Sequence, residues 1–319
     1  MTSLRPADTG AEAEAFASAT ATLAAGSRTF RLASLLLPPS ARGWGAIVYR
    51  FCRRVDDAVD DAPDAAEASA ALDCIRRELD GTAEADAPMR LFARFCLHDE
   101  QLRGAAEALM AGVEQDLAPA RFESDADLLR YAYAVAGTVG LLMCGVIGVR
   151  DRAAYPHAID LGIAMQLTNI CRDVADDARL GRRYLPADRL RRAGIEVMPG
   201  ELAIRADEAP AVAAVLNDLL DLAERYYASA DAGMRFIPWR TRIAMVVASR
   251  LYRQIGVKLR RNGARFVDGR TVVGPFEKAT TLVSALIHCF RPSVTGWGVP
   301  LRHDRLLHGP LRGLPGAAS

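Results

Sequence analysis

The chain has 319 residues, of which 51% are hydrophobic and 25% are charged, so it can bury one large core or form two domains. Its 40 basic and 39 acidic residues leave a formal net charge of +1, which excludes a general electrostatic attraction to nucleic acid or to an anionic membrane. Residues 1–14 include acidic side chains and lack an apolar segment, so they do not resemble a signal peptide. The six cysteines form no CxxC pair, and no histidine spacing completes a zinc site, so we expect reduced thiols in the core.

Helices are predicted along nearly the whole chain, because apolar residues recur three and four positions apart and β-branched alternation is rare. In chain order, we expect helices at about residues 12–25, 40–61, 66–80, 88–97, 100–117, 125–148, 155–179, 210–233, 238–262 and 275–288. Ser124 begins a capping-box-like pattern at the start of a helix, and Pro38 and Pro39 predict the start of the helix at 40–61. Residues 181–186 and 194–200 are predicted connectors, and residues 309–319 a loose tail.

No linker divides the chain, so we predict one all-α domain at residues 15–290, followed by a Pro/Gly/Arg-rich C-terminal tail at residues 291–319. Residues 132–149 could form a transmembrane helix, because they carry no charge and just reach the lower length limit for a helix that spans a bilayer. Four glycines in this stretch favour a buried core helix with close packing, and a spanning helix is the alternative.

The predicted helix at 40–61 carries a line of polar side chains on one face. At separations of four, three and four positions, over about 16 Å, this line contains Tyr49, Arg53, Asp56 and Asp60. Apolar residues occupy the other faces, so the like charges of Asp56 and Asp60 need a cation to offset their repulsion. A solvated acidic helix end is the alternative for this motif taken alone.

The predicted helix at 155–179 repeats the arrangement. Its stripe contains Gln166, Asn169, Asp173 and Asp177. Arg172 adjoins Asp173, and more arginines follow within ten residues. Carboxylates beside guanidinium groups suit a metal–diphosphate site, so two such stripes facing each other would hold Mg²⁺. An ordinary salt-bridged helix is the alternative for the second stripe alone.

Together, the stripes resemble the signatures of the squalene/phytoene synthases, a family of head-to-head prenyl synthases, and above all its bacterial phytoene synthases. The matching motifs are Y-x-F-C-R-x-V-D-D-x-V-D-D from residue 49, Q-L-T-N-I-x-R-D-V-x-x-D from residue 166 and G-R-x-Y-L-P from residue 181. Further matches are S-R-T-F from residue 27 and Y-x-Y-x-V-A-G-x-V-G from residue 131. The resemblance covers roughly residues 20–290, in order and spacing.

The resemblance implies an isoprenoid-synthase-type helical bundle with a central apolar cavity, and Mg²⁺-dependent condensation of two prenyl diphosphates, with Mn²⁺ as a substitute metal. It implies metal ligands at Asp56, Asp60, Asn169, Asp173 and Asp177. The implied substrate-binding residues are Ser27, Arg28, Phe30, Arg53, Gln166, Asn169, Arg172, Tyr252 and Arg270. Tyr49 and Tyr184 would join the four aspartates as catalytic residues.

Substrate length is a separate question. Ser34 and Ala46 are small, where relatives that use C15 substrates tend to carry bulky aromatics, so we expect a pocket that admits a C20 chain. We therefore predict that two geranylgeranyl diphosphates give phytoene, for carotenoid biosynthesis, through a cyclopropylcarbinyl diphosphate. The alternative is a C30 synthase that makes squalene, dehydrosqualene or presqualene diphosphate from farnesyl diphosphate, and only the squalene route needs NADPH. The motifs identify neither the proton-accepting base nor the oligomeric state.

Rival functions are less consistent with the motifs. A non-catalytic helical scaffold would be expected to lose carboxylates from one stripe, and a head-to-tail prenyltransferase or terpene cyclase would lack the second stripe with G-R-x-Y-L-P. Because the substrates and product are lipids, we predict a cytoplasmic protein that makes transient, peripheral membrane contact. Residues 283–290 and the basic tail at residues 291–312 are the candidates for that contact, and a loose, solvated tail is the favoured alternative. No nucleic-acid partner is expected.

Overall fold

The computed structural model describes residues 10–26, 31, 34–118, 122–196, 206–266, 269–295 and 303–318. Within these ranges the chain is helical and has no strand, which confirms the all-α prediction. The α-helices are α1 (Gly10–Gly26), α3 (Pro39–Asp60), α4 (Ala65–Leu79), α5 (Ala87–Cys96), α6 (Glu100–Glu114), α7 (Asp125–Ala132), α8 (Thr138–Val146), α9 (Tyr155–Arg179), α10 (Ala187–Arg192), α11 (Ala209–Gly233), α12 (Trp239–Arg261), α13 (Pro275–His288) and α14 (Pro292–Thr295). All six cysteines are free thiols, of which Cys96, Cys144 and Cys171 are buried in the core.

Caps explain why several helices begin where the sequence predicts. Asp64, Asp86 and Asp99 accept backbone N–H bonds of 2.8–2.9 Å at the starts of α4, α5 and α6. Ser124 and Asp127 form the predicted capping box at the start of α7. These side chains satisfy N–H groups that the first turn of a helix leaves without partners.

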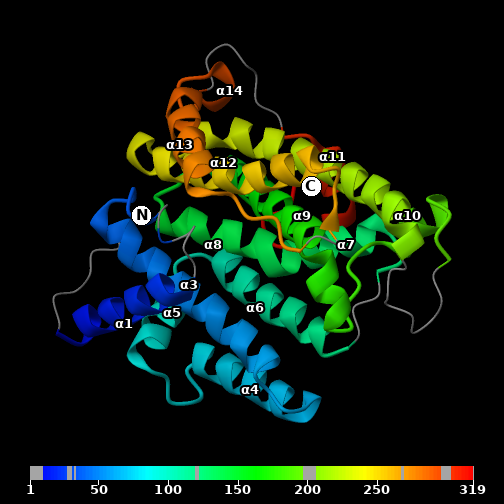
Figure 1. Cartoon of the computed structure of the whole chain (residues 1–319). Helices are drawn as coiled ribbons and strands as arrows, with labels where there is room; N and C mark the ends of the chain where they lie inside the picture. The colour runs from blue at the N-terminus through cyan, green and yellow to red at the C-terminus, as the bar shows by residue number, and fades with distance from the viewer. Residues whose placement is uncertain are drawn as a thin grey trace.

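The helix α9 lies at the centre of the molecule, in contact with α8, α11 and α12. Figure 1 shows α11, α12 and α13 on one side of α8 and α9, with α3, α4 and α6 on the other side. The core fills the space between these layers, and it includes Ile47, Phe92, Leu109, Leu141, Tyr226 and Tyr227. This order places α3 and α9, which carry the two polar stripes, on facing layers of the core.

The stretch predicted as one helix at 125–148 contains a local irregularity. A π-helical turn, η2 (Tyr133–Gly137), joins α7 to α8. Residues 125–146 are apolar and long enough to span a membrane, but 61% of the apolar part of this segment is buried inside the protein. This burial supports the predicted core helix, with α6 and α9 as its neighbours.

Two glycines allow α9 to lie unusually close to this segment. A Cβ atom at Gly162 would lie 2.2 Å from the carbonyl oxygen of Ala136, and one at Gly140 would lie 2.1 Å from that of Ala158. Backbone atoms cannot move aside as a flexible side chain can, so this approach requires glycine at both positions. The close contact holds α9, and with it the second stripe, in one position against α8.

The prediction of a loose C-terminal tail is wrong for residues 303–318. Leu307, His308 and Leu311 are buried, within or beside the 3₁₀ helix η7 (Arg305–Leu311). The Tyr133 hydroxyl donates to the carbonyl of Pro315 at 2.8 Å. Proline and glycine remove helical periodicity from a sequence, but this segment packs through buried side chains and through hydrogen bonds to its backbone carbonyls. The domain boundary at residue 290 stays a prediction.

Candidate active site

The first stripe lies on α3 with the predicted spacing. Val48, Phe51 and Val55 are buried on the other faces of the helix. Burial, and next the charge of Asp60, raise the pKa of Asp56 to about 7. The ionised carboxylates of Asp56 and Asp60 repel each other beside these apolar residues, so a bound cation would stabilise the pair.

The second stripe lies on α9 and is more strongly tied to arginine. Nε of Arg172 lies 2.7 Å, and Nε of Arg270 3.0 Å, from the same carboxylate oxygen of Asp173. Burial, and next the charge of Asp173, raise the pKa of Asp177 to about 7. The second stripe therefore resembles the first, because each has one aspartate with a raised pKa and a second aspartate paired with arginine.

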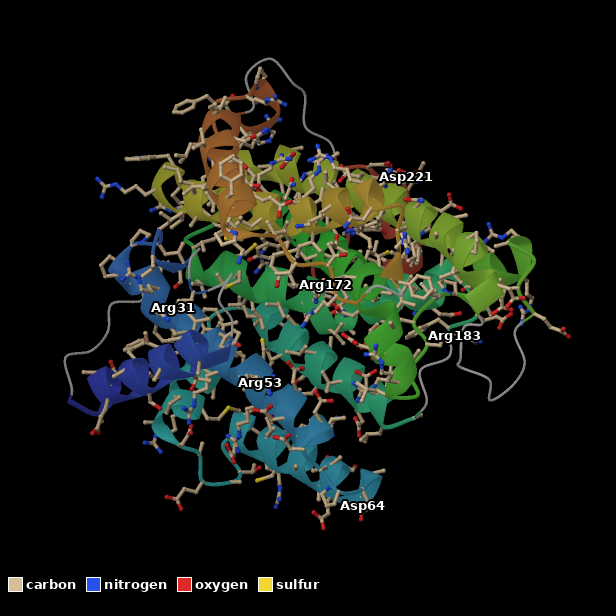
Figure 2. The ribbon with its side chains drawn as sticks, in the orientation of Figure 1. Arg31, Arg53, Asp64, Arg172, Arg183 and Asp221 are labelled. Carbon is tan, nitrogen blue, oxygen red and sulfur yellow. The ribbon has the colours of Figure 1, made fainter. Side chains whose placement is uncertain are left out.

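Arg182 and Tyr252 bring the two stripes together. Arg182 follows α9, and its guanidinium lies 3.1 Å from the carboxylate of Asp60 on α3. Tyr252 on α12 is close enough to Tyr49 and to Asp173 for both to act electrostatically on its hydroxyl, whose pKa is raised chiefly by burial. Figure 2 labels Arg53 on α3 and Arg172 on α9, near the middle of the molecule. Side chains from α3, α9 and α12 thus converge on one region, as the motifs predict.

A buried cluster beside the stripes was not predicted in full. The hydroxyls of Tyr131 and Tyr184 donate to the carboxylate of Asp116 at 2.9 and 3.2 Å, and the two rings stack with centroids 5.2 Å apart. Burial raises the pKa of Asp116, and the nearby charge of Arg182 opposes this rise. Tyr131 and Arg182 occur in motifs that the sequence singles out, but Asp116 stands in no such motif. Only the folded chain shows that Asp116 lies beside the stripes.

The remaining predicted residues are those of the S-R-T-F motif and the two small residues of the predicted chain-length pocket. Ser27, Arg28 and Phe30 lie outside the described residues. Ser34 is helical and precedes the turn that leads to α3, and its hydroxyl donates to the carbonyl of Arg31 at 2.8 Å. Ala46 is fully buried on α3, two turns before Arg53.

The donor set fits a hard divalent cation. Asn169 Oδ1 is buried and has no hydrogen-bond partner in the described part of the chain, and Asn169 Nδ2 donates to Gln166 at 3.4 Å. An unpartnered amide oxygen beside carboxylates is the ligand type that Mg²⁺ and Mn²⁺ prefer. Four aspartates and Asn169 together offer such oxygens from both stripes.

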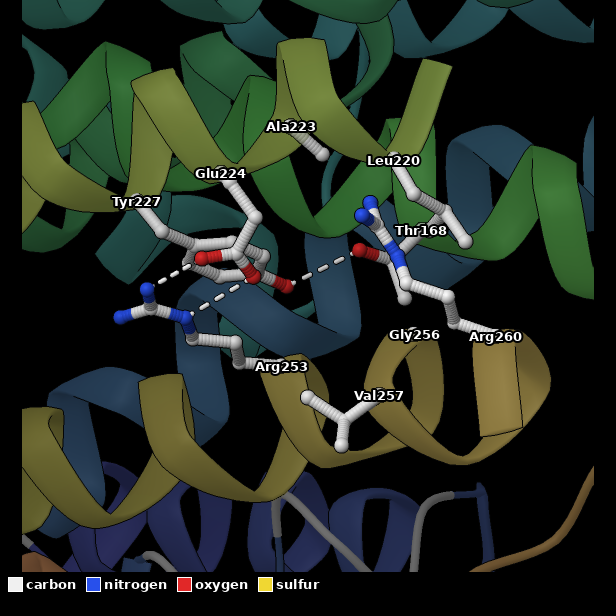
Figure 3. Close-up of a pocket in the computed structure, with 9 residues that line it drawn as sticks. All are labelled: Thr168, Leu220, Ala223, Glu224, Tyr227, Arg253, Gly256, Val257 and Arg260. Carbon is white, nitrogen blue, oxygen red and sulfur yellow. Dashed lines mark hydrogen bonds and ion pairs between the residues drawn. The ribbon is translucent and has the colours of Figure 1, made fainter. Parts of the chain in front are cut away.

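A separate cavity of about 340 Å³ lies between α9, α11 and α12. Figure 3 shows Arg253 paired with Glu224, and Tyr227 hydrogen-bonded to Thr168. Thr168 lies on a different face of α9 from Asn169 and Asp173, because adjacent helical residues are 100° apart. The main polar side chains that line this cavity are paired with one another, Arg253 with Glu224 and Tyr227 with Thr168. The cavity is therefore not part of the stripe region.

Comparisons with known proteins agree with this geometry. Residues 23–277 match the squalene/phytoene synthase family. A phytoene synthase of Pseudescherichia vulneris is 38% identical over 87% of this chain and 93% of its own. A 15-cis-phytoene synthase of Paracoccus sp. is also 38% identical, over 75% of this chain and 80% of its own. A crystal structure of a dehydrosqualene synthase with ligand has a TM-score of 0.76 and 26% identity, over 87% of this chain and 97% of its own.

Proposed function

This chain belongs to the squalene/phytoene synthase family and is a prenyltransferase, and from this premise we propose that it joins two geranylgeranyl diphosphates head to head to form phytoene. The observation that carries the proposal is the meeting of the two acidic stripes, linked by Arg182 and flanked by Arg172 and Arg270. Relatives named phytoene synthase, at 33–38% identity, support the C20 substrate.

The residues that would hold Mg²⁺ are Asp56, Asp60, Asn169, Asp173 and Asp177. When bound, the metal supplies positive charge that stabilises a departing diphosphate. Arg53, Arg172 and Arg270 add guanidinium donors suited to the same phosphate oxygens. Without substrate, Arg172 and Arg270 bind Asp173, so their guanidinium groups already lie beside the proposed metal ligands where the diphosphate would bind.

The rest of the site would handle the carbocation that remains after diphosphate leaves. Such a cation needs a region from which water is excluded. Tyr49 and Tyr252 offer aromatic faces, which attract a cation without attacking it. Asp116, which lies beside the stripes but is not a proposed metal ligand, holds the hydroxyls of Tyr131 and Tyr184 in place.

Product analysis tests the proposal directly. The purified chain is incubated with Mg²⁺ and either C15 or C20 diphosphate, with and without NADPH, and the products are separated by chromatography. We expect phytoene from the C20 substrate, with no effect of NADPH. C30 products from the C15 substrate, with the C20 substrate left unused, would overturn the proposal in favour of the squalene or dehydrosqualene alternative.

Bulky side chains near the first stripe are expected to shorten the accepted substrate. Ala46 is buried on the stripe side of α3, so Ala46→Trp would fill space there, and Ser34→Phe is expected to act in the same direction. We expect a shift in relative turnover from C20 toward C15 substrate. Competition assays with mixed substrates measure it, and Ala58→Trp, away from the stripe on the same helix, is the control. Equal loss with both substrates would show that the substitutions only damage packing.

Mg²⁺ is expected to raise the unfolding temperature more at pH 8 than at pH 6. The pKa of Asp56 and that of Asp177 are raised to about 7, so the native protein binds more protons than the unfolded chain between about pH 4 and pH 7. The ionisation of Asp56 and Asp177 therefore lowers the free energy of unfolding as pH rises from about 4 to about 7. Bound Mg²⁺ offsets this loss of stability once the two carboxylates are ionised. Calorimetry at both pH values measures the effect, and it should disappear when both aspartates are replaced by asparagine. Equal shifts at the two pH values would contradict the metal assignment.

We also propose that the protein is cytoplasmic and docks transiently on a bilayer through α13. An apolar stripe is exposed along this helix and just beyond it, at Phe276, Val283, Leu286, Ile287 and Phe290. Their spacing puts them on one outer face, while Ala285 and His288 are buried on the inner face. The lipid nature of the proposed substrates and product supports a bilayer as the partner of this face.

Replacing Val283, Ile287 and Phe290 by serine is expected to reduce binding to phosphatidylcholine vesicles. The stripe is apolar, so binding should change little with salt. Sedimentation with vesicles measures the bound fraction, and Leu97→Ser, at an exposed leucine after α5, serves as the control. Equal binding by the triple variant and the native chain would argue against α13 as the contact.

A further inference from the structure

We propose that His157, Asp160 and His303 form a site for one divalent cation of the zinc class, which fastens the C-terminal segment to α9. His157 and Asp160 lie in the first two turns of α9, and His303 precedes η7. Asp160 and Asp173 are thirteen positions apart on the same helix, or about 20 Å, so this site is distinct from the acidic stripes. It is also independent of the proposed prenyl chemistry.

The three side chains already lie close enough to act together. One ligand atom of each lies within 4.8 Å of the others. Asp160 is fully buried, and the side chain of His303 is 8% exposed. Two imidazoles and a carboxylate form a donor set typical of zinc, whereas Mg²⁺ prefers oxygen atoms alone.

Neighbouring groups orient the ligands as in a metal site. Nδ1 of His157 lies 2.8 Å from the carbonyl oxygen of Ser229, which only accepts, so Nδ1 carries the proton and Nε2 keeps a lone pair. Nδ1 of His308 accepts from the backbone N–H of Ala318 at 2.8 Å, so its Nε2 donates to Asp160 at 2.9 Å. One imidazole is thus set to bind a cation, and another holds the carboxylate in place.

His303 supplies the observation that points to a ligand. Its Nε2 lies 2.8 Å from Asp160, and its Nδ1 is buried with no hydrogen-bond partner among the described residues. If Nε2 carries the proton, a buried lone pair is left unused at Nδ1. If Nδ1 carries it, two acceptors face each other across 2.8 Å. A cation bound between Nε2 and the carboxylate would remove the conflict of the second arrangement, in which Nδ1 carries the proton.

The site also has a route for an ion. A cavity of about 660 Å³ has His157 and His303 in its wall, together with residues of the segment 313–318. Arg152 lines the same cavity, but its charge is paired with Asp99 at 3.1 Å. No sequence motif indicates this site, because 143 positions separate Asp160 from His303.

Zinc titration of the full chain tests the proposal. After dialysis against a chelator, the protein is held in excess Mg²⁺, which occupies the acidic stripes, and Zn²⁺ binding is measured by competition with a chromophoric chelator. We expect one tightly bound Zn²⁺ per chain, lost in His157→Ala and in His303→Ala and kept in His98→Ala, whose histidine is exposed and outside the cluster. Bound Co²⁺ should show the visible absorption of a nitrogen-ligated ion.

The native chain alone decides the outcome if a variant fails to fold. Zn²⁺ should slow the release of C-terminal residues by carboxypeptidase, because the ion ties that segment to α9. Absence of tight Zn²⁺ binding by the native chain, or equal binding by a folded His303→Ala variant, would overturn the proposal. The cluster would then be a hydrogen-bonded network only.

Discussion

Asp173→Ala is expected to lower turnover by about a thousand-fold or more, with little change in helical content. The carboxylate of Asp173 binds Arg172 and Arg270 and is a proposed metal ligand, so its loss removes charge stabilisation for the departing diphosphate and releases both arginines. Asp56→Ala is expected to have a similar effect from the facing stripe. Steady-state assays with C20 diphosphate, together with circular dichroism, measure both.

The control for this experiment lies one turn further along the same helix. Asp176 is 46% exposed and pairs with Arg179, so Asp176→Ala removes a carboxylate of the same helix that is not a proposed metal ligand. Its turnover should stay near that of the native chain. Near-native activity in both Asp56→Ala and Asp173→Ala would contradict the metal assignment.

The helices and the stripes were predictable because both are periodic. Each stripe needs only one helix to align its side chains, and spacings of three and four show this in the sequence. The facing of the two stripes came from family resemblance, since no periodicity relates α3 to α9. The structure links the stripes through Arg182 and Asp60, a contact between residues 122 positions apart.

The features that were missed depend on tertiary contacts. Asp116 has no distinctive neighbours in sequence, and only folding places it under the hydroxyls of Tyr131 and Tyr184. The C-terminal segment lacks helical periodicity, so its burial was not predicted. The missed Asp116 and the wrong prediction for the C-terminal segment have the same cause. Local sequence patterns do not show which distant groups will form hydrogen bonds with a buried polar atom.

Asp160→Ala is expected to destabilise the protein by about 3–5 kcal/mol, because it leaves the buried donors that bind this carboxylate without an acceptor, at about 1–3 kcal/mol each. The carboxylate of Asp160 has no exposed surface and interacts with His303 at 2.8 Å and His308 at 2.9 Å. Burial opposes its ionisation, but hydrogen bonds from the two histidines outweigh burial and hold its pKa below the ordinary value. Its contribution to stability is therefore present above about pH 4 and is lost as pH falls through the lowered pKa.

Urea unfolding at neutral pH measures this change, and Asp304→Ala is the comparison within the same segment. Asp304 accepts the backbone N–H of Leu306 at 3.0 Å at an exposed position, where water can replace the lost bond, so its removal should cost about 1 kcal/mol. Carboxypeptidase should then release C-terminal residues faster from Asp160→Ala than from Asp304→Ala. Equal stability and equal digestion of the two variants would mean that the segment is held by the burial of Leu307 and Leu311 rather than by Asp160. A large difference would show that one buried carboxylate on α9 fixes a chain end that its sequence marks as loose.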